Sequence, residues 1–171
     1  MNLFILRHGI AVERDTKSFP DDSGRPLTLK GEDRIRLVCD AIRGLDISFD
    51  QILSSPFLRA RQTADIVASE LNLRNILCFR DELKPGGEFK ALIRQINLLR
   101  PAPENVLLVG HEPDLSHLIS QLISGQSEAF VDLKKGGFAK LEIKERLRPA
   151  RCATLNWLLT PKQMALMVTS R

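Results

Sequence analysis

Two apolar runs of this sequence each end in a histidine. Residues 3–6 (Leu-Phe-Ile-Leu) lead into Arg7 and His8, and residues 106–109 (Val-Leu-Leu-Val) lead, after one glycine, into His111. Short continuous apolar runs are typical of strands buried on both faces of a parallel sheet. Where a buried strand ends in strongly polar side chains, those side chains are candidates for ligand binding or catalysis.

A second arginine follows a third short strand. Residues 51–53 are predicted to be extended, and two serines after them lead into Pro56 and Arg59. Ser55 as N-cap and Pro56 at the first helical position predict a helix start, which puts Arg59 in the first turn. Because the carboxyl ends of parallel strands meet at one edge of a sheet, we expect Arg59 to join the other three side chains there.

This combination of side chains suits a phosphoryl group. Guanidinium groups bind phosphate oxygens through paired hydrogen bonds and keep their charge, and a histidine can attack phosphorus and carry the group covalently. Predicted helix N-termini after Pro56 and Pro113 add positive dipole ends, and Gly9 lets the backbone approach a ligand. Each residue alone would more simply be solvated, but their joint placement at three strand ends favours a phosphoryl site.

Other ways of handling phosphate find no match in the sequence. The G-x-x-x-x-G-K-[ST] loop does not occur, and no arginine lies six residues after Cys39, Cys78 or Cys152, as the cysteine phosphatase pattern requires. The three histidines form no cluster with carboxylates, so we expect no metal and no other cofactor. The odd number of widely spaced cysteines predicts free thiols, and His117, in mid-helix, is predicted to be structural.

An alternation of strands and helices must position these residues. Helical apolar spacing is found at residues 35–45, 60–71, 89–96 and 115–122. Thr28 is the expected cap of the first helix, and a weaker strand is expected at 75–79. The alternation predicts an α/β fold, a three-layer sandwich with a mainly parallel sheet and helices on both faces. Residues 138–143 and 152–158 alternate apolar and polar side chains and predict an antiparallel C-terminal extension.

The bulk composition indicates one soluble globular domain. The chain of 171 residues is 43% hydrophobic and 27% charged, which is typical of soluble proteins with a single core. Its formal net charge of +4 is spread along the chain and gives no support for nucleic-acid binding. The first apolar run is too short for a signal peptide or a membrane span, so we expect a cytoplasmic protein without a membrane partner.

Four blocks of the sequence resemble the histidine phosphatase superfamily, which includes the phosphoglycerate mutases and many phosphatases. LRHG at residues 6–9 resembles its N-terminal signature, SSPFLRARQTA at 54–64 its second block and VGHEP at 109–113 its third. RPLTLKG at 25–31 and the short length are most similar to the SixA-type phosphohistidine phosphatases of bacteria. The resemblance implies a single histidine phosphatase domain over residues 1–171 and a metal-independent phosphatase of the phosphoric monoester hydrolase class.

The resemblance also implies roles for individual residues. His8 would be the nucleophile, Arg7 and Arg59 would bind the phosphoryl oxygens, and His111, as an imidazolium, would stabilise the transferring group. Arg25 lies in a loop that could reach the phosphate or the substrate. We expect the arginines to lower the pKa of His8 and a backbone carbonyl to hold its tautomer. The predicted reaction is hydrolysis of phosphohistidine on a signalling phosphotransfer protein, through a phospho-His8 intermediate.

The acid that protonates the leaving group is harder to place. Many members of the superfamily carry it in an insertion after the third strand, where this chain has the short segment 81–88, with Glu82 as the candidate. A short segment leaves an open site, which favours a macromolecular substrate over a mutase reaction, and a P–N bond breaks readily once the imidazole is protonated. Two alternatives stay open: a phosphatase of small phosphomonoesters at the same site, and a phosphate-binding module without catalysis.

Overall fold

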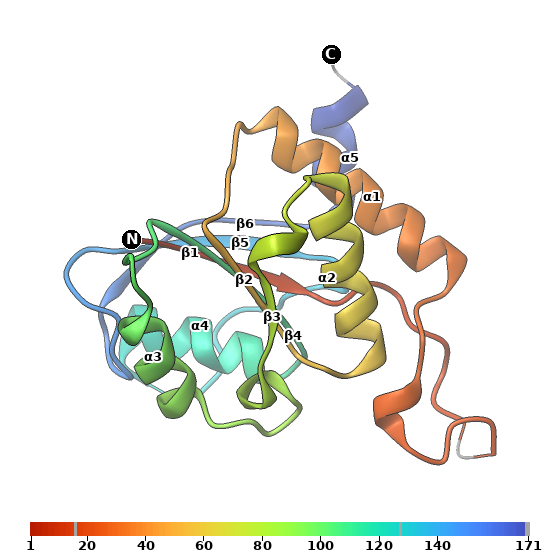
Figure 1. The fold of residues 1–171 in the computed structure, drawn as a ribbon, viewed down its shortest axis with the longest axis horizontal. Coiled ribbons are helices and arrows are strands. Elements are labelled where there is room, and N and C mark those ends of the chain that lie inside the picture. The colour runs from red at the N-terminus through yellow and green to blue at the C-terminus, as the bar shows by residue number, and fades with distance from the viewer. Residues whose placement is uncertain (16, 127, 170–171) are drawn as a thin grey trace.

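A mixed sheet forms the middle layer of the protein (Figure 1). The computed structural model describes residues 1–15, 17–126 and 128–169. The strands are β1 (Asn2–Arg7), β2 (Gln51–Ser54), β3 (Leu77–Phe79), β4 (Asn105–Gly110), β5 (Phe138–Ile143) and β6 (Ala153–Leu159). Their order in the sheet is β3-β2-β4-β1-β5-β6. Neighbouring strands from β3 to β1 pair in parallel, and β5 pairs antiparallel with both β1 and β6. The predicted antiparallel extension is thereby confirmed.

Helices cover both faces of the sheet, as predicted. They are α1 (Leu29–Gly44), α2 (Leu58–Glu70), α3 (Phe89–Leu98), α4 (Asp114–Ser124) and α5 (Pro161–Thr169). Figure 1 shows α1, α2 and α5 on one side of the sheet and α3 and α4 on the other. Successive side chains of β1 point to opposite faces of the sheet. Phe4 and Leu6 pack in the core on the side of α1, α2 and α5, and Leu3 and Ile5 pack in the core on the side of α3 and α4.

The register of the parallel strands aligns their carboxyl ends along one edge of the sheet. Arg7 of β1 pairs with Gly110 of β4, and Ser54 of β2 pairs with Val109 of β4. The residue that follows each strand therefore lies at the same edge of the sheet. This register carries His8, Ser55 and His111 to that edge.

Helix α2 begins later than the sequence predicts. The first helical residue is Leu58 and Phe57 is the N-cap, whereas Ser55 and Pro56 lie before the helix. Ser55 N donates to Val109 O (3.0 Å), so this residue still belongs to the edge of the sheet. The prediction of a Ser55 cap was wrong because a bond distant in sequence, from Ser55 N to Val109 O, keeps this residue in the hydrogen bonding of the sheet, and the helix begins only at Leu58. The predicted Thr28 cap of α1 is confirmed by its bond from Gly31 N (3.0 Å).

The C-terminal helix α5 is absent from the predicted elements. Its apolar residues 164–168 run consecutively and show no helical spacing, and among these five only Met164 is fully buried, against the layer that contains α1. The local signal lies at its start, where Thr160 Oγ1 accepts from Gln163 N (3.3 Å) and Pro161 occupies the first helical position. A cap without a periodic apolar face was too little to predict the helix.

Three further findings concern the chemistry that the chain can support. Cys39, Cys78 and Cys152 are free thiols, as predicted. The described residues contain no group of three or more His, Cys, Asp or Glu side chains that could hold a metal ion. None of the helices described has the length and apolar character needed to cross a bilayer.

Candidate active site

Hydrogen bonds tie together the ends of β1 and β4 and the start of α2. His8 N donates to Gly110 O (3.1 Å), which holds the residue after β1 against the end of β4. Gly9 N donates to Thr63 Oγ1 (3.1 Å), and Thr63 Oγ1 donates to Arg59 O (2.7 Å). Buried Thr63 therefore links the turn after β1 to the first turn of α2. Three segments that are distant in the sequence are held as one unit around His8.

The His8 imidazole is buried and neutral. Its side chain is held through Nδ1, which lies 2.7 Å from Gly9 O, and since a carbonyl only accepts, Nδ1 carries the proton. Nε2 then has a lone pair, which accepts from Arg59 Nε (3.2 Å). The pKa of His8 is lowered to about 3, mainly by burial, and the charges of His111, Arg59 and Arg7 act in the same direction. The pKa falls as expected, but burial is the main cause rather than the arginines.

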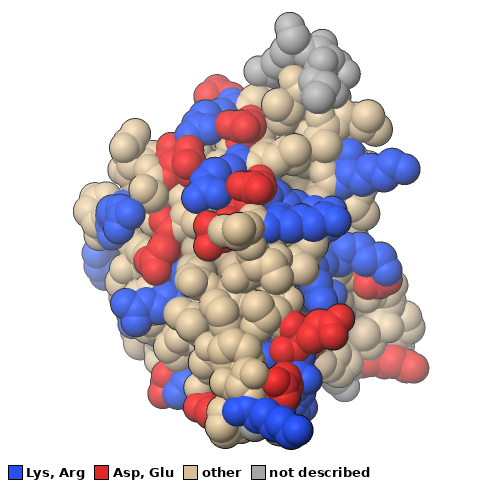
Figure 2. All heavy atoms as spheres, turned by 90° about the vertical axis from the view of Figure 1, so that its right-hand side faces the viewer, with Lys and Arg blue, Asp and Glu red and all other residues tan. Residues whose placement is uncertain are grey.

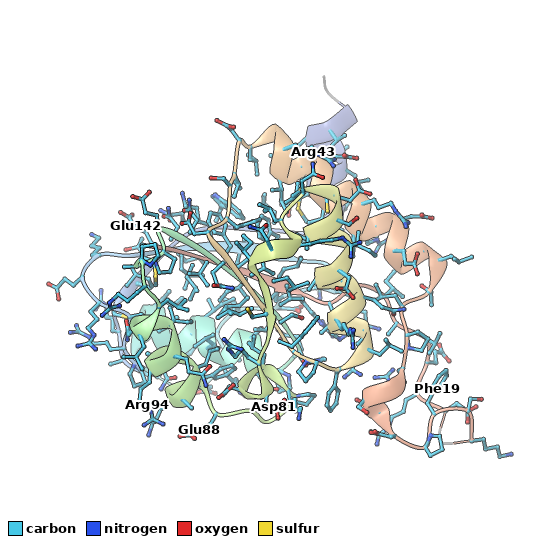
Figure 3. The ribbon with its side chains drawn as sticks, viewed as in Figure 1. Phe19, Arg43, Asp81, Glu88, Arg94 and Glu142 are labelled. Atoms are coloured by element: carbon cyan, nitrogen blue, oxygen red, sulfur yellow. The ribbon has the colours of Figure 1, made fainter. Side chains whose placement is uncertain are left out.

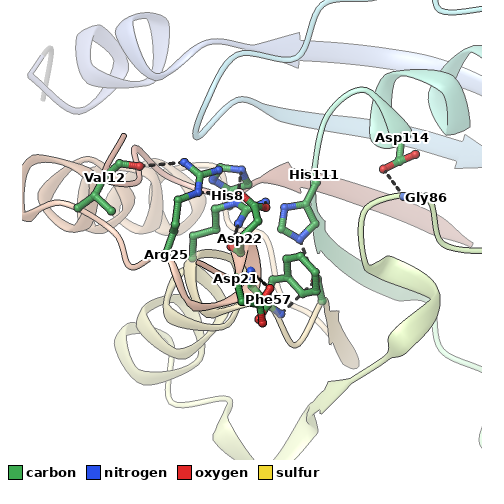
Figure 4. A network of polar contacts seen from close by, with 12 residues as sticks. His8, Val12, Asp21, Asp22, Arg25, Phe57, Gly86, His111 and Asp114 are labelled. Carbon is green, nitrogen blue, oxygen red and sulfur yellow. Dashed lines mark hydrogen bonds and ion pairs between the residues drawn. The ribbon is translucent and has the colours of Figure 1, made fainter. Parts of the chain in front are cut away.

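The His111 imidazole is held through its other nitrogen. Nε2 lies 2.8 Å from Ser55 Oγ, and that oxygen already accepts from Phe57 N (3.2 Å). The Ser55 hydroxyl therefore has its own proton to donate to Nε2, and the ring proton of His111 is assigned to Nδ1. The centroids of the His8 and His111 rings are 5.1 Å apart, and the Phe57 ring meets His111 edge-on (Figure 4). His111 is thus assigned an N–H group on a ring that lies beside the His8 ring.

The protonated form of His111 that the resemblance implies is disfavoured. Burial lowers the pKa of His111 to about 3, and the positive charge of Arg59 contributes in the same direction. The ring is only 2% exposed. A neutral ring that donates through Nδ1 replaces the expected imidazolium, because a buried site already rich in arginine opposes another positive charge.

Arg59 lies between His8 and a carboxylate. While Nε donates to His8, Nη1 donates to Asp22 O (2.8 Å) and Nη2 to Asp22 Oδ2 (2.9 Å). The other oxygen of this carboxylate, Oδ1, accepts from Arg25 Nε (2.7 Å), and Arg25 Nη1 is held by Val12 O (2.9 Å; Figure 4). Partial burial raises the pKa of Asp22, but Arg59 and Arg25 outweigh it, so the pKa is lowered and the carboxylate is ionised. Asp22 thus brings the predicted residue Arg25 to the site.

Arg7 and His111 have buried donors without partners. Arg7 Nη1 donates to Leu133 O (2.9 Å), but Arg7 Nε and His111 Nδ1 are buried and make no hydrogen bond within the described parts of the chain. Glu112 Oε1, which is an acceptor, is also buried without a hydrogen-bond partner among the described residues. Buried polar groups are nearly always hydrogen-bonded, so these donors beside His8 indicate a ligand that offers acceptor oxygens.

Gly9 is required by packing. A Cβ at this position would lie 3.0 Å from Ile35 Cγ1 and 3.2 Å from both Gly31 O and Leu27 Cδ2. These contacts come from α1 and the residues before it. The absence of a side chain therefore lets α1 pack closely against the turn after β1, a reason different from the approach to a ligand that the sequence predicts.

Glu82 is directed elsewhere by its hydrogen bond. It lies in a short 3-10 helix (Asp81–Leu83), and Glu82 Oε1 accepts from Gln95 Nε2 of α3 (2.5 Å). Figure 3 labels the preceding residue, Asp81, on the side of the sheet that also carries Arg94 of α3. Among the described residues, no polar contact joins Glu82 to His8, Arg59 or His111. Its role as the acid stays a prediction.

Three residues of the site are missing from the sequence-based set. They are Thr63, Asp22 and, through its hydroxyl, Ser55. Each acts through a hydrogen bond to a residue far away in the chain: Gly9, Arg59 and His111, respectively. Two local signals existed. Thr63 lies one helical turn after Arg59, and Asp22 lies three residues before Arg25, the spacing of a side-chain ion pair.

Comparison with known proteins identifies the family of the chain. The family model of the histidine phosphatase superfamily (branch 1) matches residues 3–82. Phosphohistidine phosphatase SixA of Escherichia coli (strain K12) is 32% identical over 162 residues, which cover 94% of this chain and 94% of that protein. The chain belongs to the histidine phosphatase superfamily.

Solved structures of the superfamily agree with the fold. The structure of the protein histidine phosphatase SixA complexed with tungstate matches with a TM-score of 0.81 and 31% identity, covering 95% of this chain and 98% of that chain. The alpha-ribazole phosphatase of Shigella flexneri matches with a TM-score of 0.68 and 22% identity over 94% of this chain and 97% of that chain, and this likeness concerns the fold alone. The predicted family and the α/β fold are confirmed.

Proposed function

We propose that this chain is a phosphatase that hydrolyses phosphohistidine on a protein through a covalent phospho-His8 intermediate. The observation that carries the proposal is the state of His8. Its ring is neutral, its Nδ1 proton is held by Gly9 O, and its Nε2 lone pair lies 3.2 Å from Arg59 Nε. A histidine in this state is a nucleophile with cationic donors already in position.

In the first step, His8 Nε2 attacks phosphorus. The new P–N bond forms as the bond to the leaving group breaks, and the bond from Arg59 Nε to His8 Nε2 is exchanged for one to a phosphoryl oxygen. Arg7 Nε and His111 Nδ1, the buried donors without partners, supply further hydrogen bonds to the equatorial oxygens. Fixed donors of this kind stabilise the charge of the transferring group without reorganisation.

In the second step, water attacks phospho-His8. The P–N bond breaks, the electron pair returns to Nε2, and the proton of the attacking water is released, so inorganic phosphate and neutral His8 are regenerated. The Gly9 carbonyl keeps the proton on Nδ1 throughout, which makes Nε2 the leaving atom. Asp22 holds Arg59 and Arg25 in place during both steps.

The chemistry of the leaving group favours phosphohistidine. An alkoxide needs a strong acid to leave, whereas an imidazole that is already protonated leaves readily. Glu82, the candidate acid, is bonded to Gln95, so a substrate with an undemanding leaving group suits this site. Similarity to E. coli SixA and to the SixA structure complexed with tungstate, a tetrahedral oxyanion, supports the same choice.

A substrate panel with an alkaline quench, which preserves phosphohistidine, tests the proposal. The protein is given a histidine-phosphorylated phosphotransfer domain and, separately, a set of phosphomonoesters. We expect the highest kcat/KM on phosphohistidine, and acid-labile, alkali-stable phosphate on His8 during turnover. Faster hydrolysis of a small ester would establish the phosphomonoesterase alternative. No turnover and no phosphoenzyme, despite phosphate binding, would establish the non-catalytic module.

A further inference from the structure

A groove with mostly positive walls opens beside Arg7. It has a volume of about 930 Å³ and is formed by the first turns of α1, the turn before β5 and the start of α5. Its lining contains one carboxylate, Asp33, and six cations. These are Arg7, Lys30, Arg34, Lys134, Lys135 and Lys162. In Figure 2, several blue side chains lie close together in the right-hand half of the face shown.

Most of this charge is not neutralised by the protein. Lys134 is paired with Asp132. Four of the other cations make no ion pair with any described residue: Lys30, Arg34, Lys135 and Lys162. Like charges that line a concave surface produce a strong local potential and attract anionic partners.

The groove is built onto the end of the strand that carries His8. Gly136 N donates to both Arg7 O and His8 O (3.1 Å each), and Arg7 N donates to Gly137 O (3.1 Å). The turn with Lys134 and Lys135 is therefore bonded directly to the candidate nucleophile's backbone. The groove and the candidate site thus share Arg7 and are joined through the turn at Gly136.

The three walls of the groove meet at Gly136. Its φ of +73° suits glycine, and a Cβ there would lie 3.3 Å from Pro161 Cγ, 3.6 Å from Ile35 Cδ1 and 3.9 Å from Arg34 Cδ. Close packing of the turn against α1 and α5 fixes the spacing of the charged walls. The backbone that carries the charged side chains is therefore closely packed where the three walls meet.

We infer that this groove binds an acidic surface of the phosphoprotein substrate, an inference that rests on the proposed function. A protein suits the lining better than a nucleic acid for two reasons. The lining also contains Ile10, Leu37 and Pro161, which suit apolar side chains, and no aromatic residue on which bases could stack. The carboxylate of Asp33 would repel a continuous phosphate backbone, whereas the separate carboxylates of a protein can bind to the cations away from it.

A matched pair of peptides tests the inference. Both carry one phosphohistidine, flanked in one peptide by glutamates and in the other by glutamines. At low salt, we expect kcat/KM to be roughly tenfold or more higher for the acidic peptide, within the range that electrostatic steering provides. The preference should fade as ionic strength rises. Equal kcat/KM for both peptides at low salt would overturn the inference.

Charge-reversal variants locate the effect. The combined change Arg34→Glu, Lys135→Glu and Lys162→Glu should abolish the preference and leave hydrolysis of 4-nitrophenyl phosphate unchanged. A control with the same change in charge, Lys144→Glu, Arg148→Glu and Arg151→Glu, alters exposed cations at a separate pocket near β6 and should keep the preference. Equal loss in both variants would mean that net charge, and not this groove, is responsible.

Binding without turnover separates this inference from the proposed function. Fluorescence anisotropy measures the same peptides without phosphate. If the protein binds the glutamate peptide through the groove but hydrolyses no phosphohistidine, only the reaction is wrong. If it hydrolyses both phosphopeptides and binds neither selectively, only the groove is wrong. Tighter binding of a DNA duplex, lost in the groove variant, would assign the groove to nucleic acid and overturn the inference.

Discussion

The ends of β1 and β4 offer a direct comparison between two histidines. The strands are neighbours, with Arg7 level with Gly110, and each is followed by a buried, neutral histidine whose pKa is lowered to about 3. They differ in the nitrogen that the protein holds. His8 is bonded through Nδ1 to a carbonyl, and His111 through Nε2 to the Ser55 hydroxyl.

The partner of each ring decides what the other nitrogen can do. A carbonyl accepts and a hydroxyl can donate, so both rings carry the proton on Nδ1 but leave opposite atoms available. His8 has a lone pair at Nε2, and His111 has a donor at Nδ1. Two identical side chains at equivalent positions thereby differ in the atom they leave available, and the proposed function assigns one as nucleophile and the other as stabilising donor, which is the difference that the following experiments address.

The largest effect is expected from His8→Ala. Loss of the lone pair removes the nucleophile, and we expect turnover to fall on the order of 10⁴-fold or more. Rapid quench should find no acid-labile phosphate on the variant. His117→Ala, which changes the remaining histidine outside the site, is the control and should keep normal kinetics. Undiminished turnover in His8→Ala would refute the proposed mechanism.

Arg59→Ala tests the donor that distinguishes the surroundings of His8. Because Arg59 Nε contacts His8 Nε2 and its two other nitrogens bind Asp22, its loss should lower kcat/KM about 10²–10³-fold, as for one preorganised donor. The control Arg61→Ala removes an exposed arginine of the same helix and should have little effect. A wild-type rate for Arg59→Ala would show that this guanidinium does not act on the phosphoryl group.

His111→Asn and His111→Gln separate the two nitrogens of the second ring. Asn places an N–H close to the position of Nδ1, whereas Gln reaches the position of Nε2. We expect kcat/KM to fall about tenfold for Asn and about a hundredfold for Gln, since only Asn restores the donor. The reverse order would mean that Nε2 is the atom that serves the substrate.

Ser55→Ala removes the hydroxyl that holds the ring of His111. We expect up to about a tenfold fall in kcat/KM and a loss of stability of about 1–2 kcal/mol. The readout specific to this role is ¹H–¹⁵N NMR, in which the Nδ1–H tautomer of His111 should lose population. Ser54→Ala is the matched control, because Ser54 is equally buried but bonds to the carbonyls of Ser55 and Ala60. An unchanged tautomer in Ser55→Ala would refute the assignment.

The smallest effect concerns the pH dependence of stability. An unfolded histidine has a pKa near 6.5, and each ring here has a native pKa of about 3. The unfolded state therefore binds more protons in this window, and stability falls as the pH drops from 6.5 toward 3. Between pH 7 and pH 5, each ring should contribute roughly 1–2 kcal/mol of this loss.

Denaturant unfolding at the two pH values measures this contribution. His8→Asn and His111→Asn should each flatten the dependence on pH, whereas His117→Asn should not. If the free energy of unfolding depended on pH as steeply in His111→Asn as in the wild type, the lowered pKa of the His111 ring would be contradicted.

Patterns in the chain were enough to predict most of the framework. Continuous apolar runs predict β1 and β4, helical spacing predicts four helices, and the parallel arrangement predicts which strand ends meet. The failures arise where a distant contact outweighs a local preference. Ser55 has the residue type of a cap, but the bond from its N–H to Val109 O keeps it at the edge of the sheet, where its hydroxyl contacts His111.

Residue types and their order are local properties, and they carry the candidate nucleophile, the arginines and the three strand ends that hold them. The tertiary structure alone decides which nitrogen each histidine presents, since that depends on the group that approaches the ring. It also decides that burial is the main cause of the low pKa of His8 and that Asp22 brings Arg25 and Arg59 together. These outcomes depend on distances of a few ångströms between segments far apart in the chain, where hydrogen bonds and desolvation take effect.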